Sequence, residues 1–285
     1  MMNCTALLPT RANAHTHTKE VLHYKDALWH GFKMIKEENR PLTTRLFEEL
    51  FQIIKETTAG VRRMPGAKLA NPFGEVIYTP PEGKGIIRDK LANLERFIYD
   101  DSDLDPLIKL AVMHYQFEAI HPFTDGNGRT GRIINILYLV EVGLLDIPVL
   151  YLSRHIIDHK SAYYAGLKQI TRNHDWEPWI IYMLDAIVQT ARITRERILG
   201  IRNLMREGIE QVKQQLPKIY SKDLLELLFR QPYCKIRFLE EAGIAQRKTA
   251  SQYLRELERI GMLTPVKAGR EVYYLNTALL KLLVS

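Results

Sequence analysis

The chain has 285 residues and a hydrophobic content of 46%, so it can bury one large core and a smaller second one. Its two cysteines, Cys4 and Cys234, lie far apart in the sequence, which excludes a disulfide framework and a cysteine-rich zinc site and indicates a reducing compartment. The sequence contains no run of about 18 apolar residues and no signal-peptide core, so we expect a cytoplasmic protein without a membrane partner.

The formal net charge is +7, and the location of the excess matters more than its total. From Glu210 to the end there are 13 Lys or Arg against 8 Asp or Glu, so this last quarter carries +5 of the +7. A polyanionic partner is therefore expected, if anywhere, at the C-terminal end.

Two amphipathic helices are predicted first, over residues 18–36 and 42–57. In both, apolar residues recur at the spacing that places them on one face of a helix. We expect both faces to lie against the core. The residues are Val21, Leu28, Phe32 and Ile35 in the first helix and Leu46, Leu50 and Ile54 in the second.

The next segment, "MPGAKLANPFGEVIYTPPEGKG", is dense in Gly and Pro around one β-prone run from Glu75 to Thr79. This composition is typical of a short exposed hairpin rather than of a core strand. We therefore expect a loop that is available for binding.

Asp105 and Pro106 are typical of an N-cap and a first helical residue, and they predict a helix through Glu118. The apolar run "RIINILYLVEVGLL" then predicts a helix that is buried on most sides. Between these helices lies "HPFTDGNGRTGR", residues 121–132, a loop whose glycines directly precede the second helix. Two further amphipathic helices are predicted, near residues 160–172 and 176–200.

The glycines and the acid of this loop suit the binding of phosphate groups. The backbone N–H groups of Gly126, Asn127 and Gly128, at the positive end of a helix, would form a cradle for an anion. Asp125 beside them is placed to hold Mg²⁺, which usually takes one or two carboxylates together with phosphate oxygens.

The same loop supplies positive charge and a base. Arg129 and Arg132 are three residues apart, so one helical turn presents both toward the outer phosphates. His121, with an ordinary pKa of about 6.5, can take a proton from an incoming hydroxyl near neutral pH. Each residue alone suits a helix cap or a solvated face equally well, and Phe123 is expected in the core in either case. Their coincidence within twelve residues is what favours a phosphate site.

"HPFTDGNGRTGR" resembles the signature of Fic-domain proteins, His-x-Phe-x-Asp/Glu-Gly-Asn-Gly-x-x-x-Arg, and matches it at every defined position. The similarity extends over about residues 19–205, because "VIYTPPEG" resembles the family's target-docking flap and "SAYYAGL" resembles the helix that bears its nucleobase-contacting tyrosine. The resemblance implies a mainly α fold, a Fic-type helical bundle with a short β-hairpin flap.

Fic enzymes typically transfer AMP from ATP to a Ser, Thr or Tyr hydroxyl of a target protein and release pyrophosphate. The resemblance therefore implies a nucleotidyltransferase that uses Mg²⁺ and ATP, with a flap strand that pairs with the target through main-chain hydrogen bonds. The residues it implies are His121 as the base, Asp125 on the metal, Gly126, Asn127 and Gly128 around the α- and β-phosphates, Arg129 and Arg132 on the phosphates, Tyr163 by the adenine, and Ile77, Tyr78 and Thr79 in the flap.

Relatives of the same fold that phosphorylate their targets carry a bulkier, basic residue in the middle of the glycine turn. Gly128 leaves the cradle open, which favours AMP transfer. Transfer of UMP or phosphocholine, and removal of AMP by the same site, remain alternatives.

From about Pro217 the sequence shows three helical patterns and then a β-prone hairpin with Gly269 at its turn, which is the order of a small winged-helix domain. We place the boundary near residue 210, with a Fic catalytic domain and its N-terminal helices over residues 1–210 and a winged-helix-like domain over residues 211–285.

The segment "QRKTASQYLRELERIGML" has the pattern of a recognition helix. This pattern gives a second hypothesis, a DNA-binding regulator in which the Fic site is secondary or degenerate. The same pattern suits protein docking or a homodimer contact, and +5 is a modest charge for tight DNA binding. The outward residues are Arg247, Lys248, Ser251 and Arg255, and the inward ones are Tyr253, Leu254, Leu257 and Ile260.

Many Fic proteins are inhibited by a helix with Ser/Thr-x-x-x-Glu-Gly/Asn, whose glutamate pairs with the second arginine of the signature, here Arg132. Glu20 has a threonine four residues before it but is followed by Val21, and Glu207 lacks the Ser or Thr. We therefore expect no inhibition within this chain, unless a separate inhibitor protein supplies the glutamate.

Overall fold

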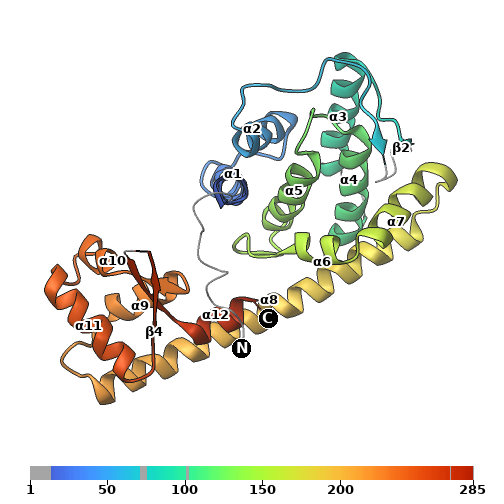
Figure 1. The fold of residues 1–285 in the computed structure, drawn as a ribbon. Helices are drawn as coiled ribbons and strands as arrows, with labels where there is room; N and C mark the ends of the chain where they lie inside the picture. Colours follow the sequence, from blue (N-terminus) through green and yellow to red (C-terminus); the bar gives the residue numbers. More distant parts are fainter. Residues whose placement is uncertain (1–13, 71–75, 101–102, 270, 285) are drawn as a thin grey trace. The chain divides into compact units, whose positions relative to one another are not determined.

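The computed structural model describes residues 14–70, 76–100, 103–269 and 271–284 (Figure 1). The chain forms two compact units, which divide between Arg192 and Ile193. The division lies inside one long helix, α8 (Glu177–Gln215). The boundary that the sequence places near residue 210 stays a prediction.

The first unit is a helical bundle built around α5 (Asn127–Glu141), which contacts α1 (Ala14–Lys36), α2 (Thr44–Lys55) and α4 (Pro106–Ile120). Every residue of α5 from Ile133 to Val140 is buried, as its apolar sequence predicts. Figure 1 shows α4 and α5 beside each other in green. The other elements of the first unit are β1 (Leu69–Ala70), β2 (Val76–Tyr78), α3 (Lys84–Ile98), α6 (Leu152–Asp158), α7 (Lys160–Asn173) and the start of α8.

The core-facing prediction is confirmed for α2 and wrong at one position of α1. Leu46, Leu50 and Ile54 are buried, whereas Val21 is 69% exposed. Val21 is exposed because α2 is too short to cover it. The C-cap of α2, Glu56, lies beside His23, so α2 does not extend along the turn of α1 that bears Val21. The remaining predicted residues of α1, Leu28, Phe32 and Ile35, do pack against the core.

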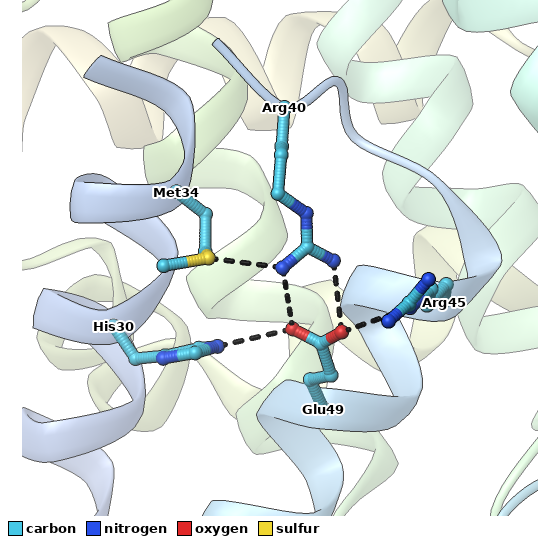
Figure 2. Close-up of polar contacts among 5 residues, drawn as sticks. All are labelled: His30, Met34, Arg40, Arg45 and Glu49. Atoms are coloured by element: carbon cyan, nitrogen blue, oxygen red, sulfur yellow. Dashed lines mark hydrogen bonds and ion pairs between the residues drawn. The ribbon is translucent and has the colours of Figure 1, made fainter. Parts of the chain in front are cut away.

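A group of polar contacts joins α1 to α2 (Figure 2). Arg40, in the connection between them, donates two hydrogen bonds to the Glu49 carboxylate, at 2.8 and 3.2 Å, and one to the Met34 sulfur at 3.0 Å. His30 of α1 and Arg45 of α2 lie 3.1 and 3.3 Å from the same carboxylate. The Arg40 hydrogen bonds hold the pKa of Glu49 below its ordinary value, so the carboxylate is ionised and links α1, α2 and the connection between them.

The Gly- and Pro-rich segment forms the expected short hairpin. β1 and β2 are antiparallel, with Leu69 opposite Tyr78 and Ala70 opposite Val76. The predicted strand from Glu75 to Thr79 is observed as Val76–Tyr78, and residues 71–75 lie outside the described part of the chain. Asp105 caps α4 by accepting a hydrogen bond from the Leu107 N–H at 2.8 Å, as predicted. Helices α3 and α6 are not predicted from the sequence.

The second unit contains the three helices and the hairpin in the predicted order. Gly269, with φ +61°, lies between β4 and β5, and a short strand, β3, completes an antiparallel sheet of order β3-β5-β4. Leu254 and Leu257 of α11 (Arg247–Arg259) are buried in the core of the second unit, as predicted. Its elements are the end of α8, α9 (Lys222–Arg230), β3 (Tyr233–Cys234), α10 (Ile236–Glu241), α11 (Arg247–Arg259), β4 (Thr264–Ala268), β5 (Glu271–Leu275) and α12 (Thr277–Val284).

Two further properties of the described residues concern the Cys234 thiol and the apolarity of the helices. Burial raises the pKa of the Cys234 thiol to about 12, so this cysteine is protonated and unreactive. None of the helices in the described ranges is both long and apolar enough to cross a membrane.

Candidate active site

The loop between α4 and α5 is held in one shape by its own residues. His121 ends α4 in the left-handed conformation, with φ +48° and ψ +59°. The Asn127 side chain then binds both backbone groups of Phe123, accepting from its N–H and donating to its carbonyl at 2.8 Å each. Phe123 is buried, as predicted, and stacks on Phe51 with ring centroids 4.2 Å apart. Asn127 therefore shapes the loop, and its amide has both its hydrogen-bonding atoms engaged.

Helix α5 begins without the usual means of stabilising a helix start. Its N-cap is Gly126, which adopts φ +77° and has no side chain to accept a hydrogen bond, and the first turn holds no acidic residue. The first N–H groups of a helix have no acceptor within it, so this end carries positive charge that an anion can neutralise. A Cβ on Gly128 would lie 3.1 Å from Nη1 of Arg132, so a side chain there would crowd the arginine.

Asp125 lies at the mouth of this loop, with its side chain 65% exposed. Nζ of Lys55, at the end of α2, lies 2.5 Å from its Oδ2, and Nη2 of Arg129 lies 3.8 Å away. The Lys55 hydrogen bond, more than any other contact, holds the pKa of Asp125 below its ordinary value. The carboxylate is thus ionised and already binds a cation.

The two arginines of the loop have different partners. Arg132 donates from Nε to Oγ of Ser153 at 2.9 Å, and the Tyr24 hydroxyl of α1 lies 3.5 Å from the same oxygen. Arg129 lies 3.4 Å from the carboxylate of Glu20, which is also on α1. Helix α1 therefore contacts both arginines. Glu20 pairs with Arg129 directly, and Tyr24 reaches Arg132 through the Ser153 hydroxyl.

Glu20 is the more informative of the two glutamates considered as inhibitors. The sequence argues against it because Val21 follows it, yet the structure places its half-exposed carboxylate on Arg129, the first of the two arginines in the loop. It does not pair with Arg132, the arginine that the family pattern names. Glu207 is exposed on α8 in the second unit.

His121 is half-buried at the end of α4 and is suited to act as a base. Burial is the main cause that lowers its pKa below the ordinary 6.5, the charge of Arg62 acts in the same direction, and the carbonyl of Glu118 and the charge of Asp125 oppose it. Nδ1 is the buried nitrogen of the ring. The imidazole is therefore neutral at pH 7 and can accept a proton.

A buried acid beneath the cradle is not predicted from the sequence. Glu118 of α4 is half-buried as a residue, its Oε1 is enclosed, and burial raises the pKa of its carboxyl to about 7, with the charge of Arg132 opposing this. A Cβ on Gly131 would lie 2.8 Å from its Oε1, so the glycine makes room for the acid. Its signal in the sequence, a single glutamate three residues before His121, is indistinguishable from a surface residue.

Tyr163 lies in the core rather than at the surface. It is 5% exposed, its hydroxyl lies 3.0 Å from Nε2 of His114, and its ring packs beside Trp179. Burial lowers the pKa of His114 to about 3, so that imidazole is neutral. The next residue, Tyr164, is 51% exposed and has its ring centroid 5.4 Å from that of Tyr163.

The flap residues differ in orientation. The Tyr78 hydroxyl donates a hydrogen bond to the carbonyl of Ala119 at 2.9 Å, so this side chain faces α4. Thr79 is exposed, and the side chain of Ile77 lies outside the described part of the structure. The backbone of β2 is paired with β1 along one edge.

Comparison with known proteins identifies the two parts of the chain. A model of the Fic/DOC family matches residues 41–139, and a model described as "Protein adenylyltransferase SoFic-like, C-terminal domain" matches residues 204–279. The chain is 31% identical over 108 residues to protein adenylyltransferase fic-1 of Caenorhabditis briggsae and 30% identical over 112 residues to protein adenylyltransferase Fic of Drosophila melanogaster. These matches cover 37% and 39% of this chain, which spans about a fifth of the length of these relatives (20% and 21%).

Solved structures share the fold. A Fic family protein from Desulfovibrio desulfuricans G20 aligns with a TM-score of 0.53 at 19% identity, over 90% of this chain and 75% of that one. A Fic domain containing signaling protein from Bacteroides thetaiotaomicron aligns with a TM-score of 0.53 at 18% identity, over 67% of this chain and 76% of that one. Residues 41–139 of this chain are therefore similar to the Fic/DOC domain and residues 204–279 to the SoFic-like C-terminal domain, and the solved structures share the fold.

Proposed function

We propose that this protein is an adenylyltransferase that transfers AMP from ATP to a hydroxyl group of a target protein and releases pyrophosphate. The observation that carries the proposal is the convergence, at one end of α5, of a neutral histidine, an ionised carboxylate and two arginines around an uncapped helix start. The printed names of the curated relatives and of the C-terminal family model support AMP as the transferred group.

In this proposal ATP lies with its phosphates on the N-terminal turn of α5. The N–H groups of Gly126, Asn127 and Gly128 bind the α- and β-phosphates, while Arg129 and Arg132 take the outer negative charge. Because Glu20 occupies Arg129, that arginine must exchange a carboxylate for a phosphate when ATP binds. Tyr163 would support the adenine pocket from beneath, since it is buried and Tyr164 is the exposed tyrosine beside it.

The residues present fit a Mg²⁺ ion bound together with ATP. Within the described ranges, no group of three or more His, Cys, Asp or Glu is arranged to hold a metal by itself. A single exposed, ionised carboxylate that already binds an ammonium group suits Mg²⁺, which completes its shell with phosphate oxygens and water. Asp125 would hold the ion, which neutralises phosphate charge when bound.

Transfer then requires one proton acceptor and fixed positive charge. The hydroxyl oxygen of the target forms a bond to the α-phosphorus of ATP, the bond from that phosphorus to the bridging oxygen breaks, and pyrophosphate leaves. Nε2 of His121 accepts the proton of the hydroxyl, since Nδ1 is buried. Arg132 and the start of α5 stabilise the charge that develops on the phosphates.

We further propose that the target binds as a strand along β2. Main-chain hydrogen bonds to Val76–Tyr78 would hold it without a strict requirement for its sequence. Tyr78 faces α4, and Thr79 is free to contact the target.

The function is tested by the products and by the metal. Purified chain with ATP and Mg²⁺ should release one pyrophosphate for each AMP that becomes bound to protein. In Asp125→Ala the rate of transfer should fall, and the Mg²⁺ concentration that gives the half-maximal rate should rise. Undiminished transfer by Asp125→Ala with Mg²⁺ withheld would remove Asp125 from the metal site, and release of phosphate instead of pyrophosphate would remove AMP transfer.

A second candidate function concerns the second unit, where a DNA contact is supported by the charge of α11. Arg247, Lys248 and Arg255 are exposed on it, and its first turn holds no acidic residue. Gel shifts of double-stranded DNA at two salt concentrations test this, because phosphate contacts make affinity fall steeply with salt. An unshifted DNA at low salt would leave protein docking or homodimer contact as the role of this unit.

A further inference from the structure

The end of α4 presents several backbone carbonyls that the helix itself cannot satisfy. The last carbonyls of a helix have no N–H partner further along it, and here the left-handed conformation of His121 turns the chain away at once. The carbonyls of Ala119, Ile120, His121 and Pro122 all accept hydrogen bonds from a segment distant in sequence. The donors come from two residues, Arg62 and Tyr78.

Arg62 supplies most of these donors. Its Nε donates to the His121 carbonyl at 2.8 Å, its Nη2 lies 3.5 Å from the Ile120 carbonyl, and its backbone N–H donates to the Pro122 carbonyl at 2.9 Å. Nη2 also donates to the carbonyl of Pro81 at 2.5 Å. A guanidinium presents five donors in a fixed plane, which suits carbonyls that converge from several directions.

This arrangement is costly if its only purpose is stability. Arg62 is 4% exposed, no carboxylate of the described residues lies within 4 Å of it, and its Nη1 is buried without a partner among those residues. Removing a guanidinium from water is unfavourable and lowers its pKa, and here burial outweighs the opposing charge of Glu82, which makes no ion pair with Arg62. A neutral residue could close a helix end at lower cost, so the position of the charge calls for a functional reason.

Tyr78 and Pro81 provide that reason, because both belong to the flap segment. Tyr78 is the last residue of β2, and its hydroxyl donates to the carbonyl of Ala119 at 2.9 Å, two residues before His121. Pro81 follows the hairpin, and Arg62 precedes it. The hairpin is thus tied at both of its ends to the backbone around His121.

We propose that Arg62 and Tyr78 form a carbonyl clamp, defined as their hydrogen bonds to residues 119–122 and Pro81, which positions His121 and holds the flap in register with it. Arg62 and Tyr78 are positioning residues, because they touch the backbone of the base and not the reacting atoms. A target strand paired with β2 is then held at a fixed distance from the base that receives its proton. This inference rests on the proposed function of His121 and adds the residues that set its position.

The test compares Arg62→Lys and Tyr78→Phe with two matched controls. Arg63→Lys alters the neighbouring, exposed arginine, and Tyr115→Phe removes a hydroxyl of α4 that lies 3.1 Å from Oγ1 of Thr171 on α7. The rate measured is self-modification with labelled ATP at saturating concentration, together with the ATP concentration that gives half of it. We expect the maximal rate to fall about tenfold or more in Arg62→Lys and about two- to tenfold in Tyr78→Phe. The half-saturating ATP concentration should stay within about twofold of wild type, and both controls should keep the wild-type rate.

A second readout needs no transfer activity. The carbon-13 signal of the His121 ring, identified by its loss in His121→Ala, should shift in Arg62→Lys and Tyr78→Phe without nucleotide and stay in place in both controls. An unshifted signal in Tyr78→Phe overturns the clamp, as does a wild-type maximal rate in that variant. Should Arg62→Lys fail to fold, Tyr78→Phe decides alone. Should neither the wild-type chain nor Glu20→Gly transfer AMP, the proposed function fails, and the ring signal still decides the clamp.

Discussion

Two helices of this protein begin in opposite ways. Helix α9 follows Ser221, whose hydroxyl accepts a hydrogen bond from the Leu224 N–H at 3.1 Å, and carries Asp223 in its first turn. Helix α5 follows Gly126, which has no side chain, and carries Arg129 where an acid would be favourable. The first helix neutralises its own positive end, and the second leaves that end for a ligand.

The difference separates scaffold from site. A helix with an unsatisfied start needs stability from elsewhere, and α5 gains it from burial, since Ile133 to Val140 are all enclosed by the bundle. Helix α9 is amphipathic and short, so its cap is a larger share of its stability. An uncapped start is not sufficient by itself, because α3 also follows a glycine, Gly83, without a side-chain cap. What distinguishes the start of α5 is the set of His121, Asp125, Arg129 and Arg132 around it.

Removal of the base should break the loop's function most completely. In His121→Ala we expect transfer to fall by at least about 100-fold, because no other group accepts the proton of the hydroxyl. ATP binds through α5 and the arginines, so its dissociation constant, measured by calorimetry, should stay within about twofold. A parallel loss of ATP affinity would contradict the role of His121 as base.

The pH dependence of transfer should reflect the burial of the same residue. A base acts in its neutral form, which persists to lower pH when its pKa is lowered, so the acid limb of kcat/KM should have its midpoint below 6.5. Below that midpoint the rate should fall about tenfold per pH unit. Glu118 also titrates in this range, because burial raises the pKa of its carboxyl to about 7. Repeating the profile in Glu118→Gln therefore shows whether the acid limb comes from His121 or from Glu118. A midpoint above 6.5 in both proteins would argue against a buried, neutral His121.

The two helix starts can be tested against each other directly. Gly126→Ala forces a Cβ into a left-handed residue at φ +77°, which costs about 1–2 kcal/mol, and should weaken ATP binding several-fold by distorting the cradle. Ser221→Ala should lower the free energy of unfolding by a similar amount, about 0.5–2 kcal/mol, without changing transfer. Thermal unfolding and ATP titration of both variants measure this. If Gly126→Ala and Ser221→Ala weakened ATP binding equally, the difference between the two helix starts would have no bearing on ATP binding.

The smallest effect is expected at Glu20. An exposed ion pair is worth about 0.2–1 kcal/mol, so freeing Arg129 in Glu20→Gly should raise self-modification by no more than about fivefold. The matched variant Glu207→Gly, at an exposed position of α8, should leave the rate unchanged. If the wild type were inactive and Glu20→Gly were active, α1 would be a full inhibitor. That result would contradict the expectation of no inhibition, which was drawn from Val21 at the position where the family pattern has Gly or Asn.

What could be predicted from the sequence was local. Asp105 and Pro106 define the start of α4, Gly269 marks the hairpin of the second unit, and the signature residues between α4 and α5 are contiguous, so nearest-neighbour chemistry suffices. Helix α6 has only seven residues, which is too few for a clear period. Helix α3 was missed although Ile87, Leu91, Leu94 and Ile98 recur at helical spacing. Val21 fits the helical period but lies past the end of the helix that would cover it.

What could not be predicted was the partner of each site residue. Lys55 is one of 40 Lys and Arg and lies 70 residues before Asp125, so nothing in the sequence distinguishes it. The same holds for Arg62, whose neighbour Arg63 is exposed. Tyr163 and Tyr164 are adjacent, and only the packing of α7 decides which of them is buried.

The chemistry of the α5 site is tested most directly by the phosphate that remains on the protein. Wild-type chain and His121→Ala are incubated with Mg²⁺ and with ATP labelled either at the α-phosphate or at the γ-phosphate, and the protein is then separated and counted. AMP transfer predicts stable label from the α-position, none from the γ-position, and neither in His121→Ala. Label from the γ-position in the wild type would mean phosphoryl transfer with the nucleotide reversed, and it would contradict the proposed function.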